Sequence, residues 1–187
     1  MEGEGNRMKK IRKTAGITVR TVLMALLVML TSQGCRMSYS FTGASISPAV
    51  KTVSIANMPN NAGLVVPTLS RTITEALRDY FTSQTNLVLV DRNGDLNLEG
   101  TITQYAVQPV AIQGNETAAM NRLTITVNIK FSNKTAPNDP VQNWESTFSR
   151  YQDYSSSFNL VSVQDGLIRE ITSQLVQDIF NKAVVNW

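Results

Sequence analysis

Residues 123–131 impose the strictest constraint on the fold, because apolar and polar side chains alternate there without a break. The even positions carry threonine, asparagine and lysine, and the odd positions are Leu123, Ile125, Val127, Ile129 and Phe131. Successive side chains of a strand point to opposite faces of a sheet. The segment therefore predicts a strand with one buried face and one exposed face, in a sheet that is covered on one side only.

Two other segments carry apolar residues at helical spacing. The first covers about residues 67–83, and its Pro67 suits the first turn of a helix. In the second, Ser162 followed by Asp165 resembles a capping box at the start of the helix. The apolar face of this second helix is formed by Ile168, Ile171, Leu175, Ile179 and Ala183. Each helix has a single apolar face, so both are predicted to pack on the covered side of the sheet.

Further strands are predicted at about residues 50–56, 87–90, 96–107 and 143–151, with 87–90 short and buried. The pair Asn93-Gly94 lies between two apolar runs and predicts a hairpin turn. The resulting order is β-α-β-β-β-β-α, in which the first β-α-β unit favours parallel pairing and the later hairpins favour antiparallel pairing. The predicted fold is an α+β, two-layer α/β sandwich. It has one mixed four- to five-stranded sheet with two helices on one face.

The uncovered face of this sheet is predicted to be polar and mostly uncharged. One interpretation is a solvated face rich in threonine, which favours strands. The other is a surface that lies against a second polar surface, such as a pore lumen. Its predicted members are Glu99, Thr101, Thr103, Tyr105, Thr124, Thr126, Asn128, Lys130, Glu145, Thr147, Ser149 and Tyr151. Arg122 and Lys130 are candidates for pairing with lipid phosphates, although both also fit ordinary solubilising charges.

The first 34 residues have the pattern of an export signal. Five positive charges lie in residues 7–13, and a nine-residue apolar run at 22–30 is followed by small residues and Gly34-Cys35. A permanent membrane span needs about 20 apolar residues. Gly34-Cys35 resembles a bacterial lipobox, with Ser32 where many lipoboxes have leucine, and this implies acylation of Cys35. The basic segment after Met8 makes either Met1 or Met8 a possible start.

These features predict a lipoprotein signal peptide at residues 1–34, a lipidated tether at 35–48 and a single domain at 49–187. The tether is rich in serine, glycine and proline. Six of the 17 basic residues lie in the signal segment, against two of the 14 acidic ones, so the rest of the chain is nearly neutral. A global basic field for nucleic acid is therefore absent from the predicted domain.

The composition excludes several kinds of catalytic and metal site. The chain has no histidine and a single cysteine, which rules out Ser-His and Cys-His nucleophiles and Cys-only zinc sites. Residues 91–99 superficially resemble a calcium loop, but Gly94 falls at the fourth position where such a loop needs the sixth. We therefore predict no catalytic residue, no metal and no cofactor beyond the covalent lipid on Cys35.

Several whole segments are similar to the lipopolysaccharide-assembly lipoprotein family, LptE. They are Tyr39–Ala44 (YSFTGA), Pro67–Leu77 leading into Leu87–Asp91, Asn121–Val127 (NRLTITV) and Gln177–Ala183 (QDIFNKA). The resemblance implies a two-layer sandwich anchored to the periplasmic side of the outer membrane. It also implies a plug inside an LptD-type β-barrel that assists assembly of the barrel, with lipopolysaccharide as a second partner.

Other classes of protein remain open at this stage. A strand, a helix and then Leu87–Arg92 also resemble the α/β modules of CsgG-like lipoproteins, which form homo-oligomeric secretion pores. Such pores need long barrel-forming hairpins, and the even positions of 123–131 lack the aromatic girdle of a membrane strand. A lipid-anchored periplasmic binding module is another alternative, and a lipid-anchored enzyme is the least favoured.

Overall fold

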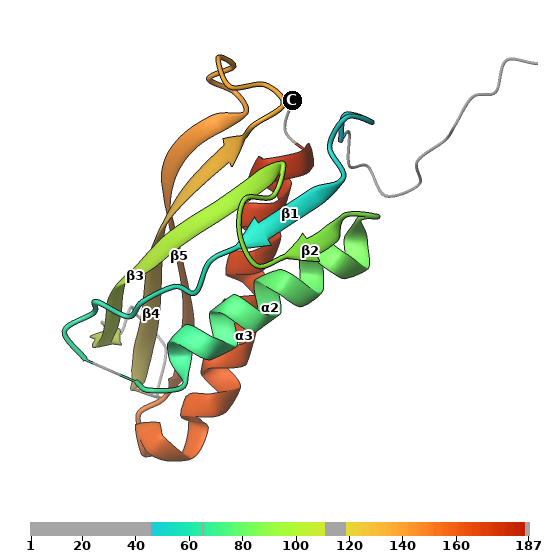
Figure 1. Cartoon of the computed structure of the whole chain (residues 1–187). Helices are drawn as coiled ribbons and strands as arrows, with labels where there is room; N and C mark the ends of the chain where they lie inside the picture. The colour runs from blue at the N-terminus through green and yellow to red at the C-terminus, as the bar shows by residue number, and fades with distance from the viewer. Residues whose placement is uncertain (1–45, 65, 111–118, 186–187) are drawn as a thin grey trace, which may run out of the picture. The chain divides into compact units, whose positions relative to one another are not determined.

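The computed structural model describes residues 46–64, 66–110 and 119–185. Within these residues, five strands form one mixed sheet, and two helices lie on one side of it (Figure 1). A π-helical turn, η1 (Asn181–Val185), extends the last helix. The α+β class and the element order are confirmed. The other elements are β1 (Thr52–Ile55), α2 (Leu69–Gln84), β2 (Val88–Val90), β3 (Leu96–Val110), β4 (Met120–Asn133), β5 (Asn143–Ser155) and α3 (Leu160–Phe180).

The strands lie in the order β2-β1-β3-β4-β5. β1 is parallel to both β2 and β3, whereas β4 is antiparallel to both β3 and β5. The parallel β1-α2-β2 unit and the later antiparallel hairpins are therefore confirmed. The predicted hairpin at Asn93-Gly94 is wrong, because β1 lies between β2 and β3 and the connecting loop has to cross it.

Close backbone approach and side-chain capping hold this crossing loop in place. A Cβ atom at Gly94 would lie 2.6 Å from the backbone nitrogen of Ser54, so the loop rests directly on β1. The Asp95 carboxylate accepts hydrogen bonds of 2.9 Å from the backbone N–H groups of Lys51 and Thr52 and from the Thr52 hydroxyl. These bonds lower the pKa of Asp95, because they favour its ionised form.

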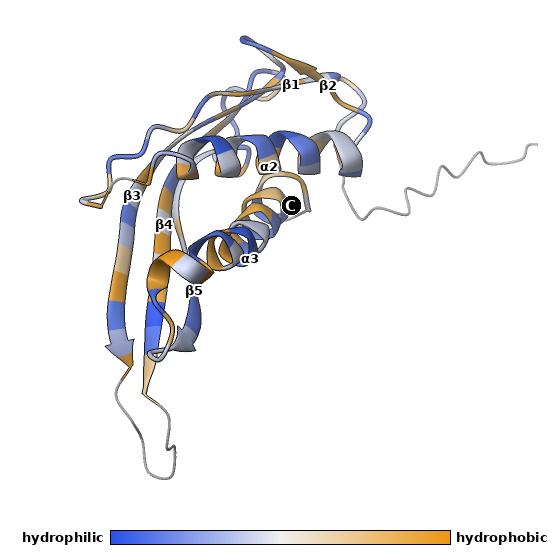
Figure 2. Cartoon of the chain, turned by 90° about the horizontal axis from the view of Figure 1, so that it is seen from below, coloured by the Kyte–Doolittle hydropathy of each residue, from blue (hydrophilic) through white to orange (hydrophobic). Residues whose placement is uncertain are grey.

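The hydrophobic core lies between the sheet and the two helices, which Figure 2 shows on the same side of the strands. The alternation in β4 is confirmed, since all five apolar residues from Leu123 to Phe131 are at most 1% exposed. The apolar faces of both helices are buried against them, and the ring of Phe180 packs edge-on against Tyr80 and Phe81. Burial of one sheet face and two helix faces thus accounts for the two layers.

Three local predictions are wrong. β2 is an edge strand and not a buried one, and Val88 is 62% exposed. Helix α3 begins before Ser162, because the side chain of Asn159 accepts a hydrogen bond from the backbone N–H of Val161 and caps the helix there. Pro67 precedes the N-cap residue Thr68 and so lies just outside the first turn of α2.

Candidate interaction surface

The sheet face turned away from the helices is formed by β3, β4 and β5. The strand register aligns its side chains in rows that run across the three strands. We call these residues the polar sheet face. The rows are Glu99–Lys130–Glu145, Thr101–Asn128–Thr147, Gln104–Thr126–Ser149, Ala106–Thr124–Tyr151 and Gln108–Arg122–Asp153.

A register shift in β3 changes the membership of this face. The shift lies between Ile102 and Gln104, leaves Thr103 without a partner in the ladder and reverses the alternation after it. Tyr105 therefore faces the helices, where it is 4% exposed and its hydroxyl accepts a 3.0 Å hydrogen bond from Gln164. Burial raises the pKa of Tyr105. The prediction that Tyr105 belongs to the polar face is wrong, and Gln104 takes its place.

Neutral hydrogen bonds occupy the centre of the polar sheet face. The Thr126 hydroxyl donates to the side-chain oxygen of Gln104 at 3.1 Å and lies 2.9 Å from the Ser149 hydroxyl. Thr126 is only 8% exposed, whereas Thr147 in the next row is exposed. Removing water from a hydroxyl or amide group costs less free energy than removing it from a charged group. The centre of this face is thus suited to contact with another polar surface.

The two candidate cations lie toward opposite ends of the polar sheet face. Arg122 donates two hydrogen bonds to Asp153, of 2.7 and 2.8 Å, and its guanidinium carbon lies 3.7 Å from the ring centre of Tyr151. These bonds lower the pKa of Asp153. Lys130 is exposed, and the ladder places it between Glu99 and Glu145. Eight residues of strand separate the two cations, about 26 Å, so the structure does not bring them together.

Four members of this face were missed in the sequence, namely Gln104, Ala106, Gln108 and Asp153, and the first three face this side because the register shift reverses the alternation in β3. Gln104 enters it only through the register shift, for which the sequence carries no clear signal. Asp153 follows Tyr151 by two positions, and its place could have been found by extending the predicted alternation beyond residue 151.

Other predicted features are not visible in the described part of the chain. Cys35 and the signal segment lie outside the described residues. Among the residues that are described, no three acidic, histidine or cysteine side chains gather to form a metal site. The helices in this part of the chain are also not long and apolar enough to cross a membrane.

The family model LptE, described as lipopolysaccharide-assembly, matches residues 50–183, which is more than half of the chain. This chain belongs to the LptE family. The match covers all five strands and both long helices, so the polar sheet face is part of the LptE-family domain.

Solved structures resemble this LptE-family chain in fold. A minor lipoprotein from Acinetobacter baumannii is 16% identical with a TM-score of 0.46, over 72% of this chain and 92% of that one. The PelC dodecamer from Paraburkholderia phytofirmans is 12% identical with a TM-score of 0.41, over 71% and 92%. A lipoprotein from Neisseria meningitidis is 12% identical with a TM-score of 0.41, over 70% and 99%. At these identities the likeness concerns fold alone, and no curated protein sequence matches the chain.

Proposed function

We propose that this LptE-family chain is the plug and assembly partner of an LptD-type outer-membrane β-barrel. In this role it acts in lipopolysaccharide transport and insertion at the outer membrane. The family match over residues 50–183 is the observation that carries the proposal. It involves no catalytic residue and no cofactor apart from the covalent lipid on Cys35.

The polar sheet face supports contact with a barrel lumen. The interior of a large outer-membrane barrel is polar. The hydroxyl and amide groups of Thr101 and Asn128, which are half-buried, and of Thr147, which is exposed, can exchange bonds to water for bonds to such a wall, with little net change in free energy. In this proposal the charged rows near the two ends set the orientation of the contact. The neutral rows between them form most of the surface that is buried against the barrel wall.

The proposed location is the periplasmic side of the outer membrane, with the lipid on Cys35 as the anchor. Two or three acyl chains hold a protein on a membrane far more firmly than one chain does. The predicted tether at residues 35–48 joins this anchor to the folded domain.

Lipopolysaccharide is the second proposed ligand, and the two candidate cations differ in their suitability for it. A lipid phosphate that reaches Lys130 also approaches the carboxylates of Glu99 and Glu145 in the same row. Arg122 has one carboxylate partner, Asp153, which a phosphate could replace with the same two-point geometry. Arg122 is therefore the stronger candidate for a lipopolysaccharide contact.

A pull-down from outer membranes in mild detergent tests this function. The tagged lipoprotein is purified, and the proteins that accompany it are identified and quantified by mass spectrometry. The proposal expects one large β-barrel protein in stoichiometric amount. A ring of copies of this chain alone would support a CsgG-like secretion pore, and recovery of the single chain would leave a lipid-anchored binding module.

A further inference from the structure

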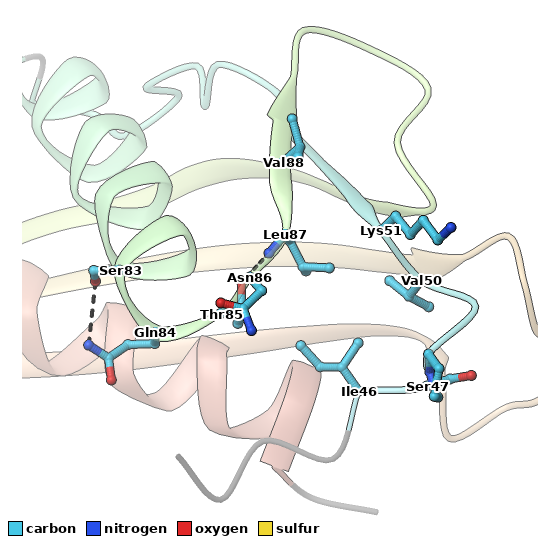
Figure 3. A pocket seen from close by; sticks show the side chains of 11 residues that line it. Ile46, Ser47, Val50, Lys51, Ser83, Gln84, Thr85, Asn86, Leu87 and Val88 are labelled. Atoms are coloured by element: carbon cyan, nitrogen blue, oxygen red, sulfur yellow. Dashed lines mark hydrogen bonds between the residues drawn. The ribbon is translucent and has the colours of Figure 1, made fainter. Parts of the chain in front are cut away.

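The chain enters the folded domain beside a cavity of about 610 Å³. The apolar wall of this cavity includes Ile46, Val50 and Leu87, and its polar rim lies at the end of α2 (Figure 3). Val50 and Leu87 are buried, whereas Ile46 is half-buried and packs against the edge of the core. Sites that take a small organic molecule commonly measure about 300–1,000 Å³, so this cavity has room for an aromatic side chain.

The first described residues of the chain lie against this cavity. Ile46, Ser47 and Pro48 all line it. The backbone N–H of Val50 donates a 2.9 Å hydrogen bond to the carbonyl of Ser47, and this bond closes a four-residue turn in which the chain reverses its direction. The segment that precedes Ile46 is therefore joined to the domain at the cavity wall itself.

This preceding segment has a composition that suits the cavity. Tyr39–Thr42 (YSFT) alternates aromatic and small polar residues, so in an extended chain both rings lie on one side. Residues 37–45 carry no charge, and Lys51 is the one charged side chain among the described residues that line the cavity. Figure 3 shows the side chain of Lys51 extending away from Ile46 and Leu87. No charge therefore opposes the burial of these two rings in the cavity.

The two aromatic side chains are also close enough to reach the cavity. Phe41 precedes Ile46 by five positions, which an extended chain spans in about 18 Å. A segment held by so short a link has an effective concentration on the order of millimolar at the site, which favours it over a free ligand. Each aromatic side chain that leaves water buries about 150–250 Å². The length and the composition of the link thus both favour an occupant from this chain.

We propose that the cavity binds the chain's own segment Tyr39–Ala44. The ring of Phe41 enters the apolar part, and Tyr39 lies at the polar rim, where its hydroxyl finds partners such as Gln84. Docking shortens the free link between Cys35 and the domain from about 40 Å to about 14 Å of extended chain. This end of the domain is then held close to the membrane.

The consequence for the membrane rests on the proposed lipid at Cys35. The docking itself depends neither on that lipid nor on the barrel partner, and it involves a different surface from the polar sheet face.

Cysteine labelling tests the docking in the full chain, purified and placed in phosphatidylcholine vesicles. Ser83 lines the cavity rim, and Thr82 is the matched control because it is the preceding residue of α2, is also exposed and does not line the cavity. A maleimide labels Ser83→Cys and Thr82→Cys in separate samples, and mass spectrometry locates the label, so Cys35 does not interfere. We expect Ser83→Cys to react about ten-fold more slowly than Thr82→Cys, because the docked segment has to open first.

Substitutions in the segment identify what protects the rim. Tyr39→Ser combined with Phe41→Ser should raise the labelling rate of Ser83→Cys about ten-fold and leave that of Thr82→Cys unchanged. Phe41→Leu keeps an apolar side chain and should retain most of the protection. These substitutions lie outside the described core, and circular dichroism checks that the fold is kept.

Four outcomes would overturn the proposal. Equal labelling of the two cysteines in the otherwise native chain would show that the cavity is open, and protection that survives the loss of both rings would show another occupant. Protection that is lost in Cys35→Ala would identify an acyl chain as the occupant, and protection that is lost on dilution would identify a second copy. No barrel protein is present in the vesicles, so a failure of the plug function leaves this result unchanged.

Discussion

Arg122 binds Asp153 through two hydrogen bonds of 2.7 and 2.8 Å across β4 and β5. The two side chains are 36% and 32% exposed, so water screens the pair and its contribution to stability is small. A lipid phosphate bound at Arg122, as proposed, would have to displace this carboxylate from the Nε and Nη2 donors of the guanidinium.

Replacing Asp153 should therefore release Arg122 for binding. We expect Asp153→Asn to change the free energy of unfolding by less than about 1 kcal/mol and to strengthen binding to lipopolysaccharide. Arg122→Gln should weaken that binding with a similarly small effect on stability. Thermal unfolding and titration with lipopolysaccharide measure the two effects. If both variants bound lipopolysaccharide as tightly as the native chain does, Arg122 would not be a lipopolysaccharide contact.

The crossing loop makes a second prediction, about stability. A Cβ at Gly94 would lie 2.6 Å from the backbone of Ser54, so Gly94→Ala should lower the free energy of unfolding by about 1–3 kcal/mol. Gly166 is the matched control, because it lies within α3 and a Cβ there meets nothing within 4 Å. Gly166→Ala should raise stability by up to about 1 kcal/mol. Denaturant titration measures both, and equal effects would contradict the close approach of the loop to β1.

The lowered pKa of Asp95 predicts that the stability of the fold depends on pH. Its pKa is lowered in the folded chain by the bonds from residues 51 and 52, so the unfolded chain binds the proton more readily. The contribution of Asp95 to the free energy of unfolding is then fully present above its pKa in the unfolded chain, about 3.9. It is lost as the pH falls through the lower pKa of Asp95 in the folded chain. We expect the stability difference between the native chain and Asp95→Asn to be largest at pH 5–7 and to shrink below pH 4.

Denaturant titrations at several pH values give this difference. Asp91→Asn, which removes an exposed carboxylate four residues earlier, controls for the change in net charge. A difference between the native chain and Asp95→Asn that stayed constant down to pH 2 would show that the Asp95 carboxylate does not act in its ionised form.

Much of the fold could be predicted because burial imposes a period on the sequence. The five apolar residues of β4 and the single apolar faces of α2 and α3 each follow from that period. Strand neighbours are a non-local property, and Asn93-Gly94 marks a turn without specifying which strand lies beside the next one. The Asn93-Gly94 pair indicates a turn at this point. Only the three-dimensional structure shows that the loop containing this pair crosses β1.

The candidate surface was predicted less completely, for a related reason. One unpaired residue, Thr103, reverses the alternation in β3 and exchanges Tyr105 for Gln104 on the polar sheet face. Nothing in the local pattern of threonines and apolar residues indicates that extra residue. The charge partner of Arg122 was missed because β5 extends to Ser155, beyond the predicted strand.

The proposed anchor gives a prediction that is separate from the fold. Cys35→Ala should abolish incorporation of radiolabelled palmitate while circular dichroism shows the native secondary structure. Palmitate that still enters the variant would show that the lipid is attached elsewhere, or that Gly34-Cys35 is not a lipobox.

The contact between the polar sheet face and a barrel is tested most directly by site-specific photo-crosslinking in cells. Thr147 and Thr101 are suitable positions, whereas Thr126 is 8% exposed and hydrogen bonded to its neighbours. Val141, which is 54% exposed in the β4–β5 connection, is the comparison position in a loop. We predict that crosslinkers at Thr147 and Thr101 trap one large outer-membrane barrel protein. Trapping of that barrel from Val141 but never from the sheet positions would contradict a contact through the polar sheet face.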